Sequence, residues 1–582
     1  MHVLSCGLLA LFLLPLNVLA RPATKTADIS RRAPPRNFVT QNGQQLMVNG
    51  SQFNYIGTTA YWLSSLNTDK DIDNTLGNIS AAGFNVVRTW AFNDVDEIPV
   101  NGTWFQLIKN GTLTINEGPN GLQKLDKVME LAQKHGIYIL LSLTNNWNPR
   151  PLTDNINVTD PLSVFRFGKR DVTPGTNNSL PRGFLSNDYG GMDAYVRNFG
   201  GPQEHDQFFT NRTVIDAFKN YTQQIVTRYT NNTNVLAWEL ANDPRCSSSI
   251  VASAGCIAQN VTRWHAELAQ HVSEHDPNHI VASGSQGFFC MDCPKLFPRV
   301  TTPPPRPSPA PGSRRSTAAP LTRDRLLKER REAFKRTRAV AKRSTSEGGI
   351  RIRGRWVSTP TRRQQETGPG SAFDGSQGVD SEDIINIPQI GLSSFQLLPD
   401  QQKYGVDDPN LPAFNNTVNQ GLDWIRQHAE VGRLFGKPVT LSSVGLVTQQ
   451  NAQAFVPFNT SVAPFAADTS STASGLPPQQ QPFATQAQAS DALSQWLQAG
   501  VLGGIQGMIQ YQWSQDNLTT QPGTVISPTV PNDSTSPTTP VNDQSGQSPN
   551  DGYGNQAVGP LANIVQSVGQ GFVPDSNTQG AT

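Results

Sequence analysis

The feature that most constrains the fold of this chain is a repeated alternation of short apolar runs with segments of helical period. β-branched and apolar runs predict buried strands, and apolar residues that recur every three or four positions predict helices. The expected strands are Phe53–Ile56, Asn85–Thr89, Ile137–Leu143, Val235–Leu240, His279–Ala282, Gly391–Leu397, Pro438–Leu441 and Ile505–Trp513. The expected helices are Asp71–Ala82, Leu122–His135, Val214–Tyr229, Val261–Glu274, Asn419–Gly432 and Ala487–Ala499. Strands that alternate with helices indicate parallel βαβ units.

About eight strand candidates are what a closed (β/α)8 TIM barrel of the α/β class requires. An open, doubly wound sheet is the structural alternative. The chain has no Gly-rich phosphate-binding loop that would support it. We therefore expect one barrel domain over residues 21–570, followed by a disordered tail at 571–582.

Four polar stretches interrupt the alternation and are predicted to be flexible insertions. They are a turn-rich loop at 151–186, a Pro- and Arg-rich segment at 294–370, and loops rich in Ser, Thr, Pro and Gln at 469–486 and 527–551. Each has too few apolar residues to form a core of its own.

The second insertion carries an unusual charge. Residues 301–370 hold eighteen Lys and Arg against five Asp and Glu, a balance of +13 that leaves −12 on the rest of a chain whose net charge is +1. Such a segment could bind a polyanion, be a protease-sensitive loop with a dibasic site at Lys342–Arg343, or come from an intron retained in the gene model. Because only two aromatics, Phe334 and Trp356, lie among the basic residues, we favour the loop and expect no nucleic-acid partner.

The N-terminus predicts export. Residues 1–20 contain an apolar run from Val3 to Leu19 and end on a small residue, as a secretory signal peptide does. No later run reaches the length of a membrane span. Fourteen Asn-X-Ser/Thr sequons, among them Asn110, Asn220 and Asn415, favour a secreted, extracellular glycoprotein.

Four cysteines remain after the signal peptide, and an even number in an oxidising compartment suggests short-range disulfides. The expected pairs are Cys246–Cys256 and Cys290–Cys293. A metal site at Cys290 and Cys293 is the rival reading, although no second such pair or nearby His accompanies them.

Polar residues that follow apolar strands are the candidates for a functional site, because barrel enzymes place their chemistry where strands end. The candidates are Arg88, Asn145-Asn146-Trp147, Asn242-Asp243 and Tyr511-Gln512-Trp513. Aromatic rings stack on sugars, and amide and guanidinium groups bind hydroxyls. Together these residues indicate a carbohydrate-binding cleft.

Four longer motifs resemble the fungal endo-β-1,4-mannanases of glycoside hydrolase family 5. They are Gly83–Asp94 (GFNVVRTWAFND), Leu143–Trp147 (LTNNW), Asp188–Met192 (DYGGM) and Ala237–Cys246 (AWELANDPRC). The resemblance covers roughly residues 36–147, 187–293 and 372–570, and its gaps coincide with the insertions.

The resemblance implies a retaining hydrolase with two catalytic glutamates, an acid/base and a nucleophile. The acid/base position is Asp243, whose carboxyl is one methylene shorter than that of Glu. The nucleophile position, within Lys437–Gly445 (KPVTLSSVG), is Ser443, which carries no negative charge. Both catalytic glutamates are therefore replaced.

Other positions of the family's site also differ here. Gln396 and Leu398 stand where the family has His and Tyr, and Tyr511 stands where it has Trp. The expected substrate-binding residues are Arg88, Asn146, Trp147, Asn242, Gln396 and Tyr511.

Three functional hypotheses remain: a mannanase with weak or absent catalysis, a non-catalytic glycan-binding pseudoenzyme, and a hydrolase of changed substrate. The expected ligand is β-mannan or a related polysaccharide. No metal or cofactor is expected because the family's hydrolysis needs only carboxylates and water, and a monomer is expected.

Overall fold

The computed structural model describes residues 38–149, 182–199, 201–299, 350–352, 355–357, 370–452, 454–456, 483–526 and 546–554. The predicted signal peptide, the C-terminal tail and most of the four predicted insertions lie outside these residues.

Eight strands form a closed barrel in which each strand pairs in parallel with its neighbours and the last pairs with the first. They are β4 (Tyr55–Thr59), β5 (Val86–Trp90), β9 (Tyr138–Ser142), β10 (Val235–Glu239), β11 (Ile280–Ala282), β14 (Ile390–Leu397), β15 (Val439–Val444) and β16 (Gly507–Gln510). Each overlaps a strand expected from the sequence. The predicted (β/α)8 barrel is confirmed, and an open sheet is excluded.

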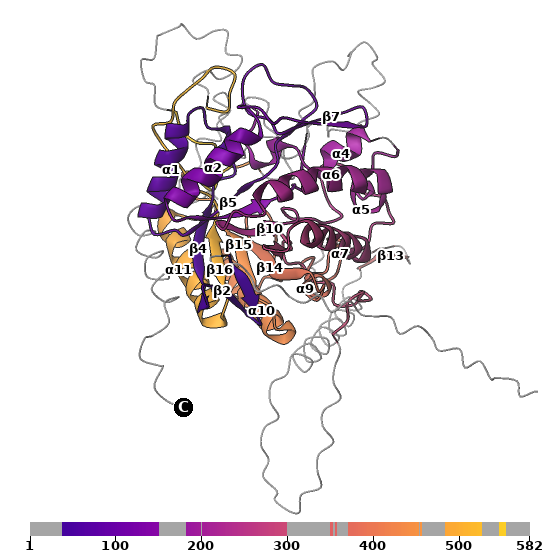
Figure 1. Cartoon of the computed structure of the whole chain (residues 1–582). Helices are drawn as coiled ribbons and strands as arrows, with labels where there is room; N and C mark the ends of the chain where they lie inside the picture. The colour runs from indigo at the N-terminus through magenta and orange to yellow at the C-terminus, as the bar shows by residue number, and fades with distance from the viewer. Residues whose placement is uncertain are drawn as a thin grey trace, which may run out of the picture. The chain divides into compact units, whose positions relative to one another are not determined.

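Long helices pack around the barrel (Figure 1). They are α1 (Asp69–Ala81), α2 (Leu122–Lys134), α6 (Arg212–Tyr229), α7 (Ala258–His275), α10 (Ala413–Phe435) and α11 (Gln486–Gly503). Shorter helices are η1 (Leu63–Ser65), η2 (Ser186–Tyr189), α4 (Met192–Asn198), α5 (Gln207–Thr210) and α9 (Ser381–Ile385). No helix among the described residues is long and apolar enough to cross a membrane.

Capping residues explain where some helices begin. Thr68 caps α1 by accepting a hydrogen bond from the backbone N–H of Asp71, so the helix begins two residues before the predicted start. Thr485 and Gln488 form a reciprocal capping box at the start of α11. The sequence expectation had omitted these polar first turns because they carry no apolar period.

Additional strands lie outside the barrel. An antiparallel sheet of β1 (Thr40–Asn42), β2 (Gln45–Val48) and β3 (Ser51–Gln52) precedes it. A second sheet contains β6 (Asp94–Val95), β7 (Gln106–Lys109) and β8 (Thr112–Ile115). Within the basic insertion, β12 (Ile350–Ile352) pairs antiparallel with β13 (Arg355–Val357).

Two apolar cores stabilise the barrel. The larger one lies between the strands and the surrounding helices. The smaller one includes inward-facing strand residues such as Tyr55 and Leu140, together with Val39 and Leu46 from the N-terminal segment. The smaller core fills its part of the barrel interior with apolar side chains. Polar side chains gather at the carboxyl ends of the strands, where the functional site lies.

Gly507 allows Tyr55 to lie across the barrel interior. A Cβ atom at Gly507 would stand 1.9 Å from Cζ of Tyr55, far inside contact distance. Tyr55 cannot easily move, since it is fully buried and its hydroxyl donates to Oγ1 of Thr440 at 2.7 Å.

We predict that Gly507→Ala lowers the free energy of unfolding by about 2–3 kcal/mol, because overpacking a dense core forces side chains out of position. Chemical denaturation measures this. The control is Gly255→Ala at an exposed position, where the added Cβ would meet only Oγ of Ser253 at 3.5 Å and should change stability by less than about 0.5 kcal/mol. Equal effects of the two variants would contradict the packing argument.

Candidate functional site

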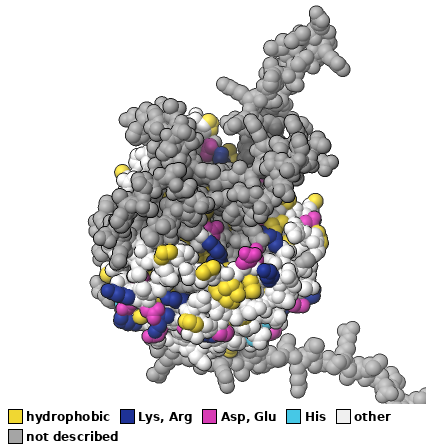
Figure 2. Space-filling view, turned by 90° about the horizontal axis from the view of Figure 1, so that it is seen from above, with side chains coloured by type: hydrophobic (Ala, Val, Ile, Leu, Met, Phe, Trp, Pro, Cys, Tyr) yellow, Lys and Arg dark blue, Asp and Glu magenta, His cyan; other side chains and the backbone are white. Residues whose placement is uncertain are grey.

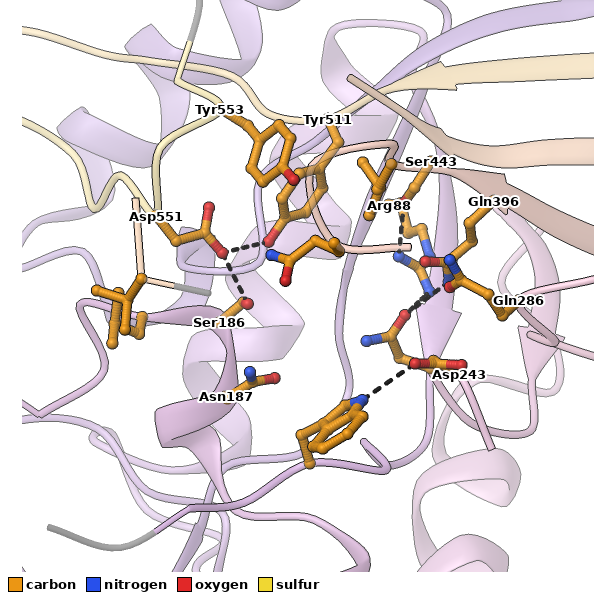
Figure 3. A pocket seen from close by; sticks show the side chains of 16 residues that line it. Arg88, Ser186, Asn187, Asp243, Gln286, Gln396, Ser443, Tyr511, Asp551 and Tyr553 are labelled. Carbon is orange, nitrogen blue, oxygen red and sulfur yellow. Dashed lines mark hydrogen bonds between the residues drawn. The ribbon is translucent and has the colours of Figure 1, made fainter. Parts of the chain in front are cut away.

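A pocket lined by polar and aromatic side chains opens at the carboxyl ends of the barrel strands (Figure 3). It is lined by Arg88, Trp147, Leu185, Ser186, Asn187, Asn242, Asp243, Gln286, Gln396, Leu398, Gln401, Ser443, Val456, Tyr511, Asp551 and Tyr553. Seven of the eight residues that the sequence singled out for substrate binding or catalysis are in this set. The exception is Asn146. This end of the fold is where (β/α)8 barrels bind their ligands.

The floor of the pocket is built on a buried ion pair between Arg88 of β5 and Glu239 at the end of β10. Nε of Arg88 donates to both carboxylate oxygens of Glu239, at 3.2 and 3.1 Å, and Nη2 pairs with the same carboxylate. Oγ of Ser142, at the end of β9, donates to Glu239 at 2.5 Å. Because β9 lies between β5 and β10 in the barrel, three consecutive strands hold this network together.

The same guanidinium group reaches the position predicted for the nucleophile. Nη1 of Arg88 donates to Oγ of Ser443 at 3.3 Å, and Nη2 donates to Oδ1 of Asn242 at 2.8 Å. Nε2 of Gln396 also donates to Oδ1 of Asn242, at 2.9 Å. Gln396 and Ser443 face each other in the register of β14 and β15. Three other sequence-predicted residues therefore surround the Arg88 guanidinium. Asn242 and Ser443 bond to it directly, and Gln396 bonds to Asn242.

Asp243, the predicted acid/base position, is buried against a second arginine. Oδ2 accepts hydrogen bonds from Nε1 of Trp147 at 3.0 Å and from Nη2 of Arg245 at 2.7 Å. Oδ1 has no partner among the described residues. Burial raises the pKa of the Asp243 carboxyl, and the charge of Arg245 opposes that shift. A raised pKa favours the protonated form that a general acid needs.

The backbone at Asp243 is left-handed, with φ of 57°. Asp tolerates this conformation better than most residues. Its N–H donates to the carbonyl of Gly284 at 2.9 Å. A Cβ at Gly284 would stand 1.7 Å from the carbonyl oxygen of Ala241, so only glycine fits beside this turn.

The opposite wall of the pocket contains a carboxylate that the sequence analysis missed. The hydroxyls of Tyr511 and Ser186 donate to Oδ2 of Asp551 at 2.6 and 2.8 Å (Figure 3). Burial raises the pKa of the Asp551 carboxyl. Tyr553 packs edge-on against Tyr511 with ring centroids 5.3 Å apart. Asp551 is the last residue of the predicted insertion 527–551. The only sequence signal for it is that an acidic residue directly precedes the Gly552-Tyr553 pair.

Asn146 lies beneath the pocket lining. It is fully buried, its Nδ2 donates to the carbonyl of Ser247 at 2.8 Å, and its Oδ1 accepts from the N–H of Arg245 at 3.1 Å. Nε2 of His205 lies 3.0 Å from the same oxygen. Asn146 therefore holds the loop that carries Arg245, while its neighbour Trp147 faces the pocket.

Disulfides brace the loops on this side of the barrel. Cys246 is joined to Cys256, just after the turn that carries Asp243, and Cys290 is joined to Cys293 after β11. Sγ atoms in a disulfide are not available as metal ligands. Within the described ranges, no three or more His, Cys, Asp and Glu side chains come together in a group that could hold a metal ion.

The pair of Arg88 and Glu239 generates a stability prediction. Replacing Glu239 with Gln leaves the Arg88 guanidinium buried without a compensating carboxylate, so we expect a loss of about 3–5 kcal/mol in the free energy of unfolding. The control is Asp423→Asn, which breaks the exposed pair of Asp423 with Arg426, whose side chains are 49% and 70% exposed. That change should have an effect below about 0.5 kcal/mol. Similar losses of unfolding free energy in both variants would contradict the argument that the buried pair of Arg88 and Glu239 contributes more than an exposed pair.

Comparisons with known proteins agree with this architecture. Residues 40–289 match the sequence model described as "Cellulase (glycosyl hydrolase family 5)". The chain is 32% identical over 288 residues to mannan endo-1,4-beta-mannosidase F of Aspergillus fumigatus, covering 48% of this chain and 55% of that protein. It is 33% identical to mannan endo-1,4-beta-mannosidase A of Hypocrea jecorina, covering 46% and 51%. The aligned part of the chain thus spans about half the length of these curated relatives.

Solved structures share the fold at lower sequence identity. The endo-1,4-beta-mannanase from Rhizomucor miehei superposes with a TM-score of 0.54 at 20% identity, covering 92% of this chain and 99% of that one. The endo-beta-1,4-mannanase from Thermotoga petrophila gives 0.52 at 17% identity, covering 90% and 78%. Residues 40–289 are therefore similar to glycosyl hydrolase family 5, part of the chain resembles fungal mannan endo-1,4-beta-mannosidases, and the fold is the (β/α)8 barrel of the solved mannanases.

Proposed function

We propose that this protein binds β-1,4-mannan or a related neutral polysaccharide in the pocket and hydrolyses it weakly or not at all. The observation that carries the proposal is the neutral hydroxyl of Ser443 at the position predicted for the nucleophile, next to Arg88.

The pocket retains groups suited to sugars. Its lining includes the aromatic rings of Trp147, Tyr511 and Tyr553, whose faces can contact the apolar side of a pyranose. It also includes the amides of Gln286, Gln396 and Asn242 and the guanidinium of Arg88, which can bond hydroxyls. Such a mixture of aromatic and convergent polar groups is typical of small-molecule and sugar sites.

The catalytic groups for a double displacement are incomplete. A retaining glycosidase needs an acid/base and a carboxylate nucleophile about 5–5.5 Å apart. Asp243 can act as the acid. The hydroxyl of Ser443 has no charge with which to stabilise an oxocarbenium-like transition state, and it would need a base to attack. The residues that line the pocket include no His to serve as that base.

A secreted, glycosylated state is part of the same proposal. The apolar run at residues 3–19, which lies outside the described residues, supports export. Asn110, Asn220 and Asn415, three of the sequon asparagines, are exposed and open to glycosylation. Figure 2 shows basic and acidic side chains mixed over the described part of one face of the molecule.

We predict that the purified protein releases no measurable reducing ends from galactomannan but binds mannohexaose in isothermal titration calorimetry. Robust hydrolysis by the wild-type chain would contradict the loss of catalysis. Absence of binding to both β-1,4-mannan and β-1,4-glucan oligosaccharides would contradict the proposed function itself.

We also predict that Asp243→Glu combined with Ser443→Glu restores hydrolysis by at least about 100-fold above background, because a carboxylate beside Arg88 supplies the missing nucleophile. Ser443→Gln combined with Asp243→Glu is the matched control. It has nearly the same shape without the charge and should remain inactive. If both pairs stay inactive while binding mannohexaose, the substituted positions Gln396, Leu398 and Tyr511 have reshaped the cleft as well.

A further inference from the structure

We propose that Asp551 is a second ligand-binding carboxyl of the pocket, which accepts a hydrogen bond from a pyranose hydroxyl on the wall opposite Asp243. This inference rests on the proposed glycan-binding function and deepens it, because it names a contact that would hold the sugar.

The two oxygens of Asp551 have different surroundings. Oδ2 accepts two hydrogen bonds, from Tyr511 and Ser186. Oδ1 is shielded from solvent and has no hydrogen-bond partner among the described residues. A carboxylate oxygen in that state costs free energy, because burial removes its water and nothing in the protein replaces it.

A second polar atom in the same part of the pocket is also without a partner. The hydroxyl of Tyr553 is buried and has no hydrogen bond within the described ranges. Tyr553 lies two residues after Asp551, and its ring packs against Tyr511, the donor to Asp551. Asp551 and Tyr553 both line the pocket, and each therefore has one polar atom that no hydrogen bond satisfies.

A sugar hydroxyl fits these two groups. It can donate to Oδ1 of Asp551 and at the same time accept from the hydroxyl of Tyr553. A carboxylate of a ligand cannot donate to Oδ1, so this contact selects a hydroxyl group. On the opposite wall, Oδ1 of Asp243 is likewise unpartnered. The pocket thus has an unsatisfied carboxylate oxygen on each side, as expected if sugar hydroxyls complete both.

The rival reading is that Asp551 acts only through Tyr511, by holding its ring in place. The two hypotheses predict different results when the hydrogen bond between Tyr511 and Asp551 is removed. Tyr511→Phe removes the hydroxyl donor and keeps the ring, whereas Asp551→Asn keeps the shape of the side chain and removes its charge. If Asp551 only positions the ring, both variants lose the same affinity.

The test is isothermal titration calorimetry of mannohexaose with the full chain and its variants, after near-ultraviolet circular dichroism has confirmed the wild-type fold of each. We expect Asp551→Asn to weaken binding by about 10-fold or more, since hydrogen bonds to charged groups are the strong ones. Tyr511→Phe should lose clearly less.

The matched control is Asp94→Asn. Asp94 is another buried carboxyl whose pKa burial raises, to about 7, and it accepts from Nε2 of Gln106 at 2.7 Å, but it does not line the pocket. The Asp94→Asn variant should bind mannohexaose as the wild type does. If Asp551→Asn does not fold, Tyr553→Phe serves in its place, with an expected loss of about 3- to 10-fold.

The outcomes separate the two claims. If the wild type binds and Asp551→Asn changes the affinity by less than about 2-fold, the role of Asp551 is overturned. The same holds if Asp551→Asn reduces the affinity only as much as Tyr511→Phe does. Both results leave the proposed function intact. No binding by the wild type overturns both.

Discussion

The buried ion pair between Arg88 and Glu239 is the interaction on which the rest of the pocket depends. A guanidinium has five donors in a fixed plane, and here they satisfy Glu239, Asn242 and Ser443 at once. Glu239 and Asn242 come from β10 and the turn after it, and Ser443 comes from β15. The pair therefore fixes the relative positions of strand ends that are distant in sequence. Because both charges are fully buried, neither partner can be lost without leaving an uncompensated charge in the protein.

This constraint explains how the fold tolerates a neutral side chain at position 443. Glu239 already neutralises Arg88, so a neutral hydroxyl at Ser443 leaves no unpaired charge behind. A glutamate there would place a second carboxylate on the same guanidinium, which favours chemistry over stability. Asp243 shows the same compromise. Its short carboxyl is held by Trp147 and Arg245, in a backbone conformation that Asp adopts at little cost.

Much of the barrel could be predicted from the sequence because strand and helix periods are local properties of the chain. Val86–Trp90 and Leu122–Lys134 appear close to where periodicity placed them. The site residues at strand ends could also be predicted, since Arg88 and Asp243 follow apolar runs. Asn146 shows the limit. It has the same local signal as Trp147, but side chains one residue apart can point to different sides of a turn, and only packing shows which of them faces the pocket.

Asp551 shows the other limit. It follows a long polar stretch with no strand before it, so no pattern in the chain links it to Arg88 or Tyr511. The sequence by itself determined the eight-stranded barrel, the strand ends that carry polar residues, and the absence of glutamate at 243 and 443. Only the tertiary structure decided which polar atoms are satisfied and which remain open at Asp243, Asp551 and Tyr553. Hydrogen-bond satisfaction is a property of three-dimensional neighbours, and those neighbours come from separate segments of the chain, as Ser186 and Asp551 do.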